Sequence, residues 1–215
     1  MRGYYAIIDI APAALGDADA TALGDEAALI RRAQALLAAE PCCLQLRAKG
    51  VDAAALRDGA RVLLPLCRAA GVPFCVNDRL DVALAVGADV VHLGQEDLPL
   101  HEARAVLRAA GRSIVVGVST HNLEQALAAA GADYIGFGPV FATGSKANPD
   151  PTVGLAALGA VVRAVPVPVV AIGGITLDRI AAVAETGAAA AAVIAAVDRS
   201  PDPTAAGRAI GAAFR

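Results

Sequence analysis

Three polar side chains alternate along one short apolar segment of this chain. Gln45, Arg47 and Lys49 are separated by single apolar residues. An extended strand places all three on the same face, because successive side chains of a strand point to opposite faces. Polar groups inside a protein need partners, since burying one unpaired costs several kcal/mol. An anionic ligand would supply partners, and so would a carboxylate on a neighbouring strand; we favour the ligand and keep the internal ion pair as the alternative.

Two aspartates follow other short apolar runs. Asp78 comes soon after Phe74–Val76, and Asp97 comes soon after Val90–Leu93. Carboxylate oxygens suit Mg²⁺, which typically takes one or two of them together with substrate phosphates and waters. Arg and Lys side chains around such an ion describe a diphosphate site. The alternative use is structural, with Asp78 capping the third helix and Asp97 the fourth.

A pair of glycines indicates a second phosphate site. Gly173 and Gly174 stand directly before a helix predicted over Leu177–Thr186, with Thr176 as its cap. Glycine lets the backbone approach a ligand closely, and the first N–H groups of a helix attract anions. A simple tight turn is the alternative.

Two predicted loops are longer than a connection requires. They span Ala11–Gly24 and Gly138–Val153, and both follow predicted strands. Loops of this length are commonly lids or binding loops. The second loop contains Thr143, Gly144, Ser145 and Lys146. Hydroxyl and ammonium donors there suit phosphates, and an ordinary surface loop is the alternative.

Alternating strand and helix patterns must position these residues. Short apolar runs predict strands at Tyr4–Ile10, Cys42–Leu46, Phe74–Val76, Val90–Leu93, Ile114–Val118, Tyr134–Phe137, Val169–Ile172 and Ala190–Ile194. Segments of helical period predict helices at Asp25–Ala39, Asp52–Ala70, Leu80–Val86, Leu100–Ala110, Leu123–Ala130, Leu155–Val165, Leu177–Thr186 and Pro203–Phe214. Asn122, and Asp202 with Pro203, are start signals for the fifth and the last helix.

Eight β/α pairs are the number found in a (β/α)₈ TIM barrel, whose active groups lie at the carboxyl ends of its strands. The polar residues above follow the predicted strands, as that architecture requires. We therefore predict one α/β domain over residues 1–215, with the site at the C-terminal ends of the strands. An open doubly wound sheet is the alternative fold.

Composition excludes several classes of function. The chain has 215 residues, a net charge of −3, no Trp and 3% aromatic residues, which argues against a nucleic-acid binder. No apolar segment reaches the roughly 18 residues of a membrane span, and Asp9 interrupts the first apolar run, so we expect a cytoplasmic protein. The four cysteines lack CxxC spacing and are expected to be reduced thiols. A barrel this short has little to cover its ends, which leaves a homo-oligomer open.

Five motifs span most of the chain in the order of a known enzyme family. They are QLRAKG (Gln45–Gly50), NDRLDVALAVGADVVHLGQEDLP (Asn77–Pro99), GVSTH (Gly117–His121), GADYIGFGPVFATGSK (Gly131–Lys146) and VVAIGGIT (Val169–Thr176). With these motifs the chain resembles the thiamine phosphate synthases, (β/α)₈-barrel transferases of thiamine biosynthesis. The resemblance implies that 4-amino-2-methyl-5-(hydroxymethyl)pyrimidine diphosphate is joined to 4-methyl-5-(2-phosphoethyl)thiazole, or to its carboxylate form with loss of CO₂. The products would be thiamine phosphate and diphosphate, and the cofactor would be Mg²⁺.

The resemblance also implies roles by position. Substrate binding would fall to Gln45, Leu46, Arg47, Ala48, Lys49, Asn77, Ser119, Thr143, Gly144, Ser145, Lys146, Gly174, Ile194 and Ala195. The catalytic residues would be Arg47, Lys49, Ser119 and Lys146. Asp78 and Asp97 would hold Mg²⁺. Within this set the pyrimidine diphosphate would contact Gln45, Arg47, Lys49, Asn77, Ser119 and Lys146. The thiazole phosphate would contact Thr143, Ser145, Gly174 and the backbone at Ile194 and Ala195.

Two positions depart from the family pattern. Ile8 stands where the family often has Thr, and Ala195 stands where it often has Ser. If position 195 binds the thiazole phosphate through its backbone N–H, Ala195 serves as well as Ser. If the hydroxyl matters, thiazole phosphate binding weakens by one hydrogen bond, about 1 kcal/mol.

Two rival functions use parts of the same pattern. A thiazole tautomerase, an isomerase on a similar barrel, needs a catalytic His, for which His121 is the candidate, although a place at the start of a helix is the favoured interpretation. His92 lies within a predicted strand and is expected to hydrogen-bond locally. A non-catalytic phosphate-sensing barrel would bind without turnover. The diphosphate and Mg²⁺ residues argue against both rivals.

Overall fold

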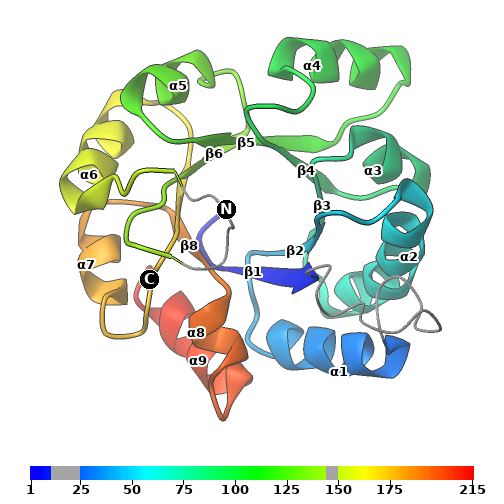
Figure 1. Ribbon diagram of the computed structural model, residues 1–215, viewed down its shortest axis with the longest axis horizontal. Helices are drawn as coiled ribbons and strands as arrows, with labels where there is room; N and C mark the ends of the chain where they lie inside the picture. Colours follow the sequence, from blue (N-terminus) through cyan, green and yellow to red (C-terminus); the bar gives the residue numbers. More distant parts are fainter. Residues whose placement is uncertain (11–24, 144–149) are drawn as a thin grey trace.

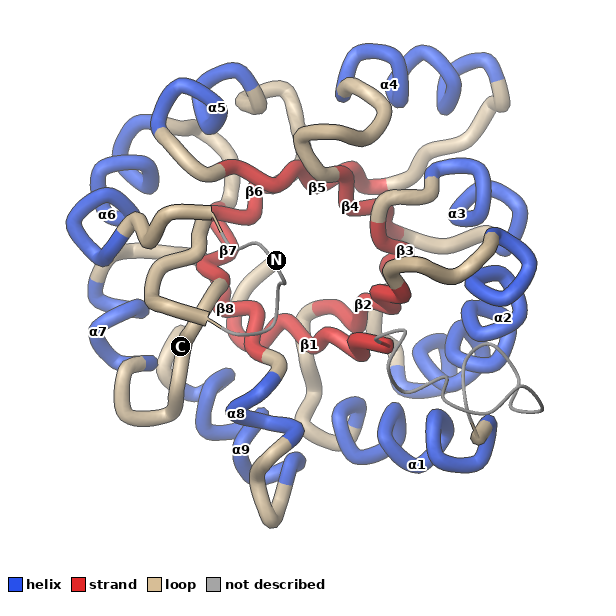
Figure 2. Tube along the Cα trace, in the orientation of Figure 1, coloured by secondary structure: helices blue, strands red, loops and turns tan. Residues whose placement is uncertain are grey.

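Eight short strands pair in chain order into a closed parallel barrel, ringed by helices (Figures 1 and 2). The computed structural model describes residues 1–10, 25–143 and 150–215. The strands are β1 (Gly3–Ile10), β2 (Cys43–Ala48), β3 (Phe74–Asn77), β4 (Val90–Leu93), β5 (Val115–Thr120), β6 (Tyr134–Phe137), β7 (Val169–Ile172) and β8 (Ala190–Val193). The predicted TIM barrel is confirmed and the open sheet is wrong, because β8 pairs with β1 and closes the ring.

Helices follow the strands around the outside of the barrel (Figure 2). They are α1 (Glu26–Leu37), α2 (Ala53–Ala70), α3 (Leu80–Val86), α4 (Leu100–Ala109), α5 (Leu123–Ala128), α6 (Gly154–Ala164), α7 (Ile180–Glu185), α8 (Ala195–Asp198) and α9 (Pro203–Ala212). The predicted start signals at Asn122 and Asp202 are confirmed, since each side chain accepts a hydrogen bond from a backbone N–H three residues ahead. Sequence reasoning missed the one-turn helix α8, because four residues carry no detectable helical period.

The seventh helix is shorter than predicted. It begins at Ile180 rather than Leu177, and its N-cap residue is Arg179, so the predicted cap at Thr176 is wrong. Gly173 and Gly174 both have positive φ, at 97° and 62°. These two residues are therefore not helical, and α7 begins six residues beyond Gly174.

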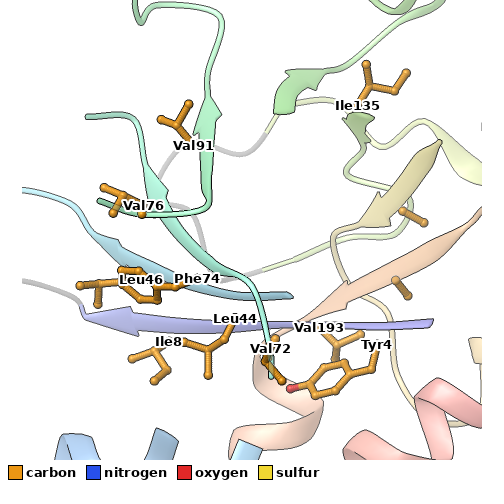
Figure 3. Close-up of a cluster of buried hydrophobic side chains, with 14 of the residues drawn as sticks. Tyr4, Ile8, Leu44, Leu46, Val72, Phe74, Val76, Val91, Ile135 and Val193 are labelled. Carbon is orange, nitrogen blue, oxygen red and sulfur yellow. The ribbon is translucent and has the colours of Figure 1, made fainter. Parts of the chain in front are cut away.

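Alternate strand residues build two separate apolar layers, because a strand has a side-chain period of two. Tyr4, Ile8, Leu44 and Leu46 point outward and pack in the layer between barrel and helices (Figure 3). The position of Ile8 therefore lies behind the barrel wall, and the departure from the family's Thr there does not face the interior.

The barrel interior combines large and small side chains. Tyr5 and Tyr134 fill it from β1 and β6, and β8, which pairs with β1, contributes the small side chains of Ala190 and Ala192. Gly117 on β5 gives Tyr134 its room, since a Cβ there would lie 2.1 Å from the Tyr134 Cζ atom. Space at the barrel centre is thus filled by tyrosine rings whose hydroxyl groups require partners.

The thiols agree with the expectation of reduced cysteines. All four are free, and Cys43, Cys67 and Cys75 are buried whereas Cys42 is partly exposed. Burial raises the pKa of the Cys67 thiol to about 12, so it stays protonated at neutral pH.

Within the described ranges, none of the helices has both the length and the apolarity needed to cross a membrane.

Candidate active site

Arg47 lies at the carboxyl end of β2 beside a carboxylate from β1. Parallel pairing sets Asp9 directly opposite Arg47, and the Nη1 atom of Arg47 lies 2.5 Å from the Oδ1 atom of Asp9. The Arg47 side chain is only 19% exposed. The internal ion pair kept as the alternative is therefore present. Sequence reasoning missed Asp9, although a carboxylate ending the neighbouring strand was the signal that could have found it.

Lys49 and Asp78 form a second ion pair at the same rim. The Nζ atom of Lys49 lies 3.3 Å from the Oδ2 atom of Asp78, although the Lys49 side chain is half exposed. Asp78 has a φ of 63°, and its N–H donates to the His92 carbonyl at 2.7 Å. A positive φ is uncommon outside glycine and costs free energy, so the β3–β4 connection holds this residue in place.

The two predicted metal ligands lie close together. Burial raises the pKa of the Asp78 carboxyl, the neighbouring Asp97 carboxylate raises it further, and Lys49 partly offsets both. The helix-capping alternative is wrong: α3 and α4 have Arg79 and Pro99 as N-cap residues, neither with a side-chain cap bond.

Asp97 instead closes the turn after β4. Its Oδ2 atom accepts from the Gly94 N–H at 2.6 Å. Among the described residues, no group of three or more His, Cys, Asp or Glu side chains could hold a metal ion. Any hard cation at this place would take two carboxylates from the protein and its remaining ligands from elsewhere.

Below this rim, polar side chains from five strands form a continuous chain of hydrogen bonds. Buried Gln45 contacts the Tyr5 hydroxyl at 3.1 Å, and the Tyr5 and Tyr134 hydroxyls are 3.0 Å apart. His92 links Tyr134 at Nδ1 (3.0 Å) to the Ser119 Oγ atom at Nε2 (2.9 Å). The expectation that His92 bonds locally is confirmed.

The environment of His92 keeps its ring neutral. Burial lowers the pKa of His92 to about 4, and the charge of Asp97 offsets only part of that effect. Gly136 has no side chain to crowd the His92 imidazole, since a Cβ there would lie 3.2 Å from His92 Cε1. Asn77, buried at the end of β3, pairs in register with His92.

The opposite side of the barrel mouth is built by the segments after β6, β7 and β8. Val140 and Phe141 donate their N–H groups to the carbonyls of Ile172 and Gly173, at 2.8 and 3.0 Å. A Cβ on Gly174 would lie 2.3 Å from the Ala142 carbonyl oxygen, so only glycine fits there. The structure thus brings Gly174 against the chain that leads into Thr143.

The predicted helix N-terminus at the glycine pair is absent, because α7 starts six residues beyond Gly174. A helix start does occur after β8, where α8 begins at Ala195 and the Ile194 carbonyl accepts from Val197 and Asp198. A short extra helix after the last strand is a frequent element of phosphate sites in these barrels.

Several predicted site residues lie elsewhere or cannot be placed. Leu46 points outward into the layer beneath the helices, and Ala48 packs against that layer, so only their backbone faces the rim. Gly144, Ser145 and Lys146 lie outside the described residues, as does the predicted loop over Ala11–Gly24.

His121 is held by two neighbours. Its Nδ1 atom lies 2.6 Å from the Gly138 carbonyl oxygen, and its Nε2 atom lies 3.6 Å from Asp150 Oδ2. The Gln125 side chain accepts from its N–H at 2.7 Å, which agrees with a residue at the start of α5.

The sequence is similar to known thiamine phosphate synthases over most of its length. A family model described as "Thiamine monophosphate synthase" matches residues 18–197. The chain is 49% identical over 187 residues to a thiamine-phosphate synthase of Anaeromyxobacter dehalogenans, covering 86% of this chain and 82% of the relative. It is 50% identical over 182 residues to one of Methanocella arvoryzae, covering 84% and 83% of the two chains.

A solved structure extends the likeness to three dimensions. The thiamine phosphate pyrophosphorylase from Pyrococcus furiosus superposes with a TM-score of 0.80 at 32% identity, covering 99% of this chain and 95% of that one. The sequence match and the barrel architecture agree over nearly the full length. This chain belongs to the thiamine monophosphate synthase family of transferases.

Proposed function

We propose that this protein condenses 4-amino-2-methyl-5-(hydroxymethyl)pyrimidine diphosphate with 4-methyl-5-(2-phosphoethyl)thiazole to thiamine phosphate and diphosphate, or accepts the carboxylate form of the thiazole with additional loss of CO₂. The observation that carries the proposal is the gathering of Arg47, Lys49, Asp78 and Asp97 at one side of the barrel mouth. Two cations beside two carboxylates suit a metal-bound diphosphate. Family membership supplies the two substrates.

The diphosphate side of the site is assigned to β2, β3 and β5. Arg47 and Lys49 each have a carboxylate partner, so they are placed and charged before any ligand arrives. Diphosphate oxygens would compete with Asp9 and Asp78 for these cations. Ser119 and Asn77, at the ends of neighbouring strands, complete this side, and Lys146 is proposed to reach it from the loop after β6.

Mg²⁺ is the proposed cofactor, and the residues present fit it. Asp78 and Asp97 offer hard oxygen ligands, and burial together with the neighbouring Asp97 carboxylate raises the pKa of Asp78. Two protein carboxylates leave the other positions to waters and phosphate oxygens, which is the usual habit of this ion. When bound, Mg²⁺ would neutralise charge on the departing diphosphate.

The thiazole phosphate is assigned to the opposite side of the mouth. Gly174 is pressed against the segment that leads into Thr143, and α8 begins nearby at Ala195. The first N–H groups of a helix have no intrahelical acceptor. A backbone site of this kind does not need a hydroxyl at position 195, so Ala195 is expected to serve. Gly144 and Ser145 are proposed as further contacts.

The chemistry needs charge stabilisation more than proton transfer. Diphosphate departs with the bonding electrons of the methylene C–O bond, and the aminopyrimidine ring delocalises the cation left behind. The thiazole nitrogen then forms the new C–N bond with that carbon. Arg47, Lys49 and Lys146 would stabilise the charge that develops on the leaving group, which is commonly the dominant contribution to such catalysis.

The test is diphosphate release and thiamine phosphate formation in the same tube. With both substrates and Mg²⁺, we expect both products to appear in equal amounts. Without Mg²⁺, or with the thiazole phosphate omitted, we expect thiamine phosphate to be absent. Bound thiazole phosphate with no release would favour a phosphate-sensing barrel, and conversion of the thiazole carboxylate alone would favour a tautomerase.

A further inference from the structure

A hydrogen-bonded chain crosses the barrel interior beneath the proposed diphosphate site. It runs through Gln45, Tyr5, Tyr134, His92 and Ser119 with donor–acceptor distances of 3.1, 3.0, 3.0 and 2.9 Å. Tyr5 and Tyr134 are almost fully buried. Every proton in such a chain must have a definite position, because a buried hydroxyl that points at a second proton loses its bond.

Gln45, at one end of this series of hydrogen bonds, determines which group donates and which accepts in each of them. An amide nitrogen only donates, so the Tyr5 oxygen accepts there and must direct its own proton elsewhere. The phenolic oxygen of Tyr134 is 3.0 Å away, and the Cys75 sulfur beside it is a weak acceptor. Tyr5 therefore donates to Tyr134.

The next two bonds follow from the same rule. Tyr134 accepts from Tyr5 and donates to the Nδ1 atom of His92, since an imidazole nitrogen is the best acceptor within reach. A neutral His92 whose Nδ1 accepts must carry its proton on Nε2. That proton lies against the Ser119 oxygen at 2.9 Å.

We infer that this buried chain presets the Ser119 hydroxyl as a hydrogen-bond donor, so that its proton points to a ligand acceptor such as a phosphate oxygen or a ring nitrogen. Ser119 is only partly buried, at the carboxyl end of β5. Tyr5, Tyr134 and His92 are then positioning residues, acting on the ligand through Ser119. The identity of the ligand as the pyrimidine diphosphate rests on the proposed function. The order of donors and acceptors along the hydrogen bonds does not depend on it.

The direction is measurable without substrate. Nitrogen NMR of the ¹⁵N-labelled full chain at neutral pH reports which imidazole nitrogen carries the proton, and His92→Gln identifies the His92 signals. We expect protonated Nε2 and bare Nδ1 for His92. His121 is an internal reference for a protonated Nδ1, because its Nδ1 faces a carbonyl oxygen and must donate. A protonated Nδ1 on His92 would overturn the proposal.

The consequence for the ligand is measured by a double-mutant cycle. Tyr134→Phe keeps the ring and removes the donor to His92, so kcat/KM for the pyrimidine diphosphate should fall about tenfold, with an unchanged KM for the thiazole phosphate. In a Ser119→Ala background the same change should cost nothing further. Equal costs in both backgrounds would overturn the link to Ser119.

Thr120→Val is the matched control for these variants. Thr120 is adjacent to Ser119 and fully buried, and its hydroxyl donates to the Gly136 carbonyl outside the interior chain. We expect it to lower stability and leave both KM values unchanged. If Thr120→Val lowered kcat/KM as much as Tyr134→Phe does, the loss in both variants would be due to altered packing, and the proposal would be overturned. Absence of turnover in the unmodified protein would count against the proposed function alone, since the tautomer measurement would still decide the direction.

Discussion

At the scale of single residues, the interior of the barrel depends on two glycines that face aromatic rings. Gly117 and Gly136 occupy neighbouring strands at positions where a side chain would enter the interior. Each leaves space that a ring occupies: Tyr134 of the adjacent strand β6 against Gly117, and His92 of β4, two strands away, against Gly136. The glycines are thus packing partners of the polar chain rather than turn residues.

This pairing predicts unequal costs for the same substitution. In Gly117→Ala the new Cβ would lie 2.1 Å from Tyr134 Cζ, so the ring must move and stability should fall by about 1–3 kcal/mol or more. In Gly136→Ala the nearest atom is 3.2 Å away, so the loss should be smaller. Urea unfolding of the two variants checks this. An equal midpoint for Gly117→Ala and the unmodified protein would show that the interior is not packed as described.

The neutral state of His92 predicts a pH dependence of stability. Its pKa is about 4 in the folded protein, against 6.5 for an ordinary histidine. Between these values the unfolded chain binds a proton that the folded protein does not. Stability is therefore full above pH 6.5 and falls as the pH drops towards 4, by up to about 3 kcal/mol. Denaturant unfolding at pH 7, 5 and 4 measures it. The His92→Gln variant should lose less stability between pH 7 and pH 4 than the unmodified protein. An equal loss in the two proteins would contradict the neutral state of buried His92.

At the scale of elements, capping explains where helices begin and where sequence patterns mislead. The last helix, α9, starts at Pro203 because Asp202 accepts from the Ala205 N–H, and it then packs on β1. The start of α7 has no such side-chain cap, since its N-cap residue Arg179 makes no cap bond. The glycines at positive φ hold only positions 173 and 174 out of helical geometry.

A cap substitution at α9 tests this account. Asp202→Ala removes the acceptor for the Ala205 N–H, and we expect a loss of about 1 kcal/mol in the free energy of unfolding. Asp202→Ser is the matched control, since Ser is an equally good cap and should retain stability. A Ser variant as unstable as the Ala variant would place the effect of Asp202 outside capping.

At the scale of the whole molecule, stability and the proposed chemistry occupy different regions. The helix-covered layer and the barrel interior hold nearly all of the buried apolar side chains. The charged groups lie at the carboxyl ends of the strands, as active groups do in this architecture. A change at the rim should therefore alter activity with little effect on folding.

Asp78→Asn tests that separation. Asn tolerates the positive φ of 63° at this position, so the fold and the unfolding midpoint should be nearly unchanged. Loss of the carboxylate should abolish the Mg²⁺-dependent formation of thiamine phosphate. Asp81→Asn is the matched control, an exposed carboxylate three residues away whose loss should leave turnover intact. Activity near the unmodified level in Asp78→Asn would remove it from the metal site.

Local sequence patterns were enough to predict the architecture and the position of the candidate site residues at the barrel rim. Apolar period and turn chemistry are local properties, so the eight strands, most helices and the rim position of Arg47, Lys49, Asp78 and Asp97 could be predicted from neighbouring residues. Boundaries shifted by a few residues where positive-φ glycines or a one-turn helix intervened.

The partners of these side chains could not be predicted from local sequence and follow from the folded barrel. Asp9 and Arg47 are 38 residues apart, and Gln45 reaches Ser119 through residues of three other strands. Such contacts depend on barrel closure and on register, which pairs residues that have no relation along the chain. Residue types and spacing predicted which groups could do chemistry. The closed barrel determines which of them are paired, neutral or directed at a ligand, because burial and long-range neighbours set hydrogen-bond direction and pKa.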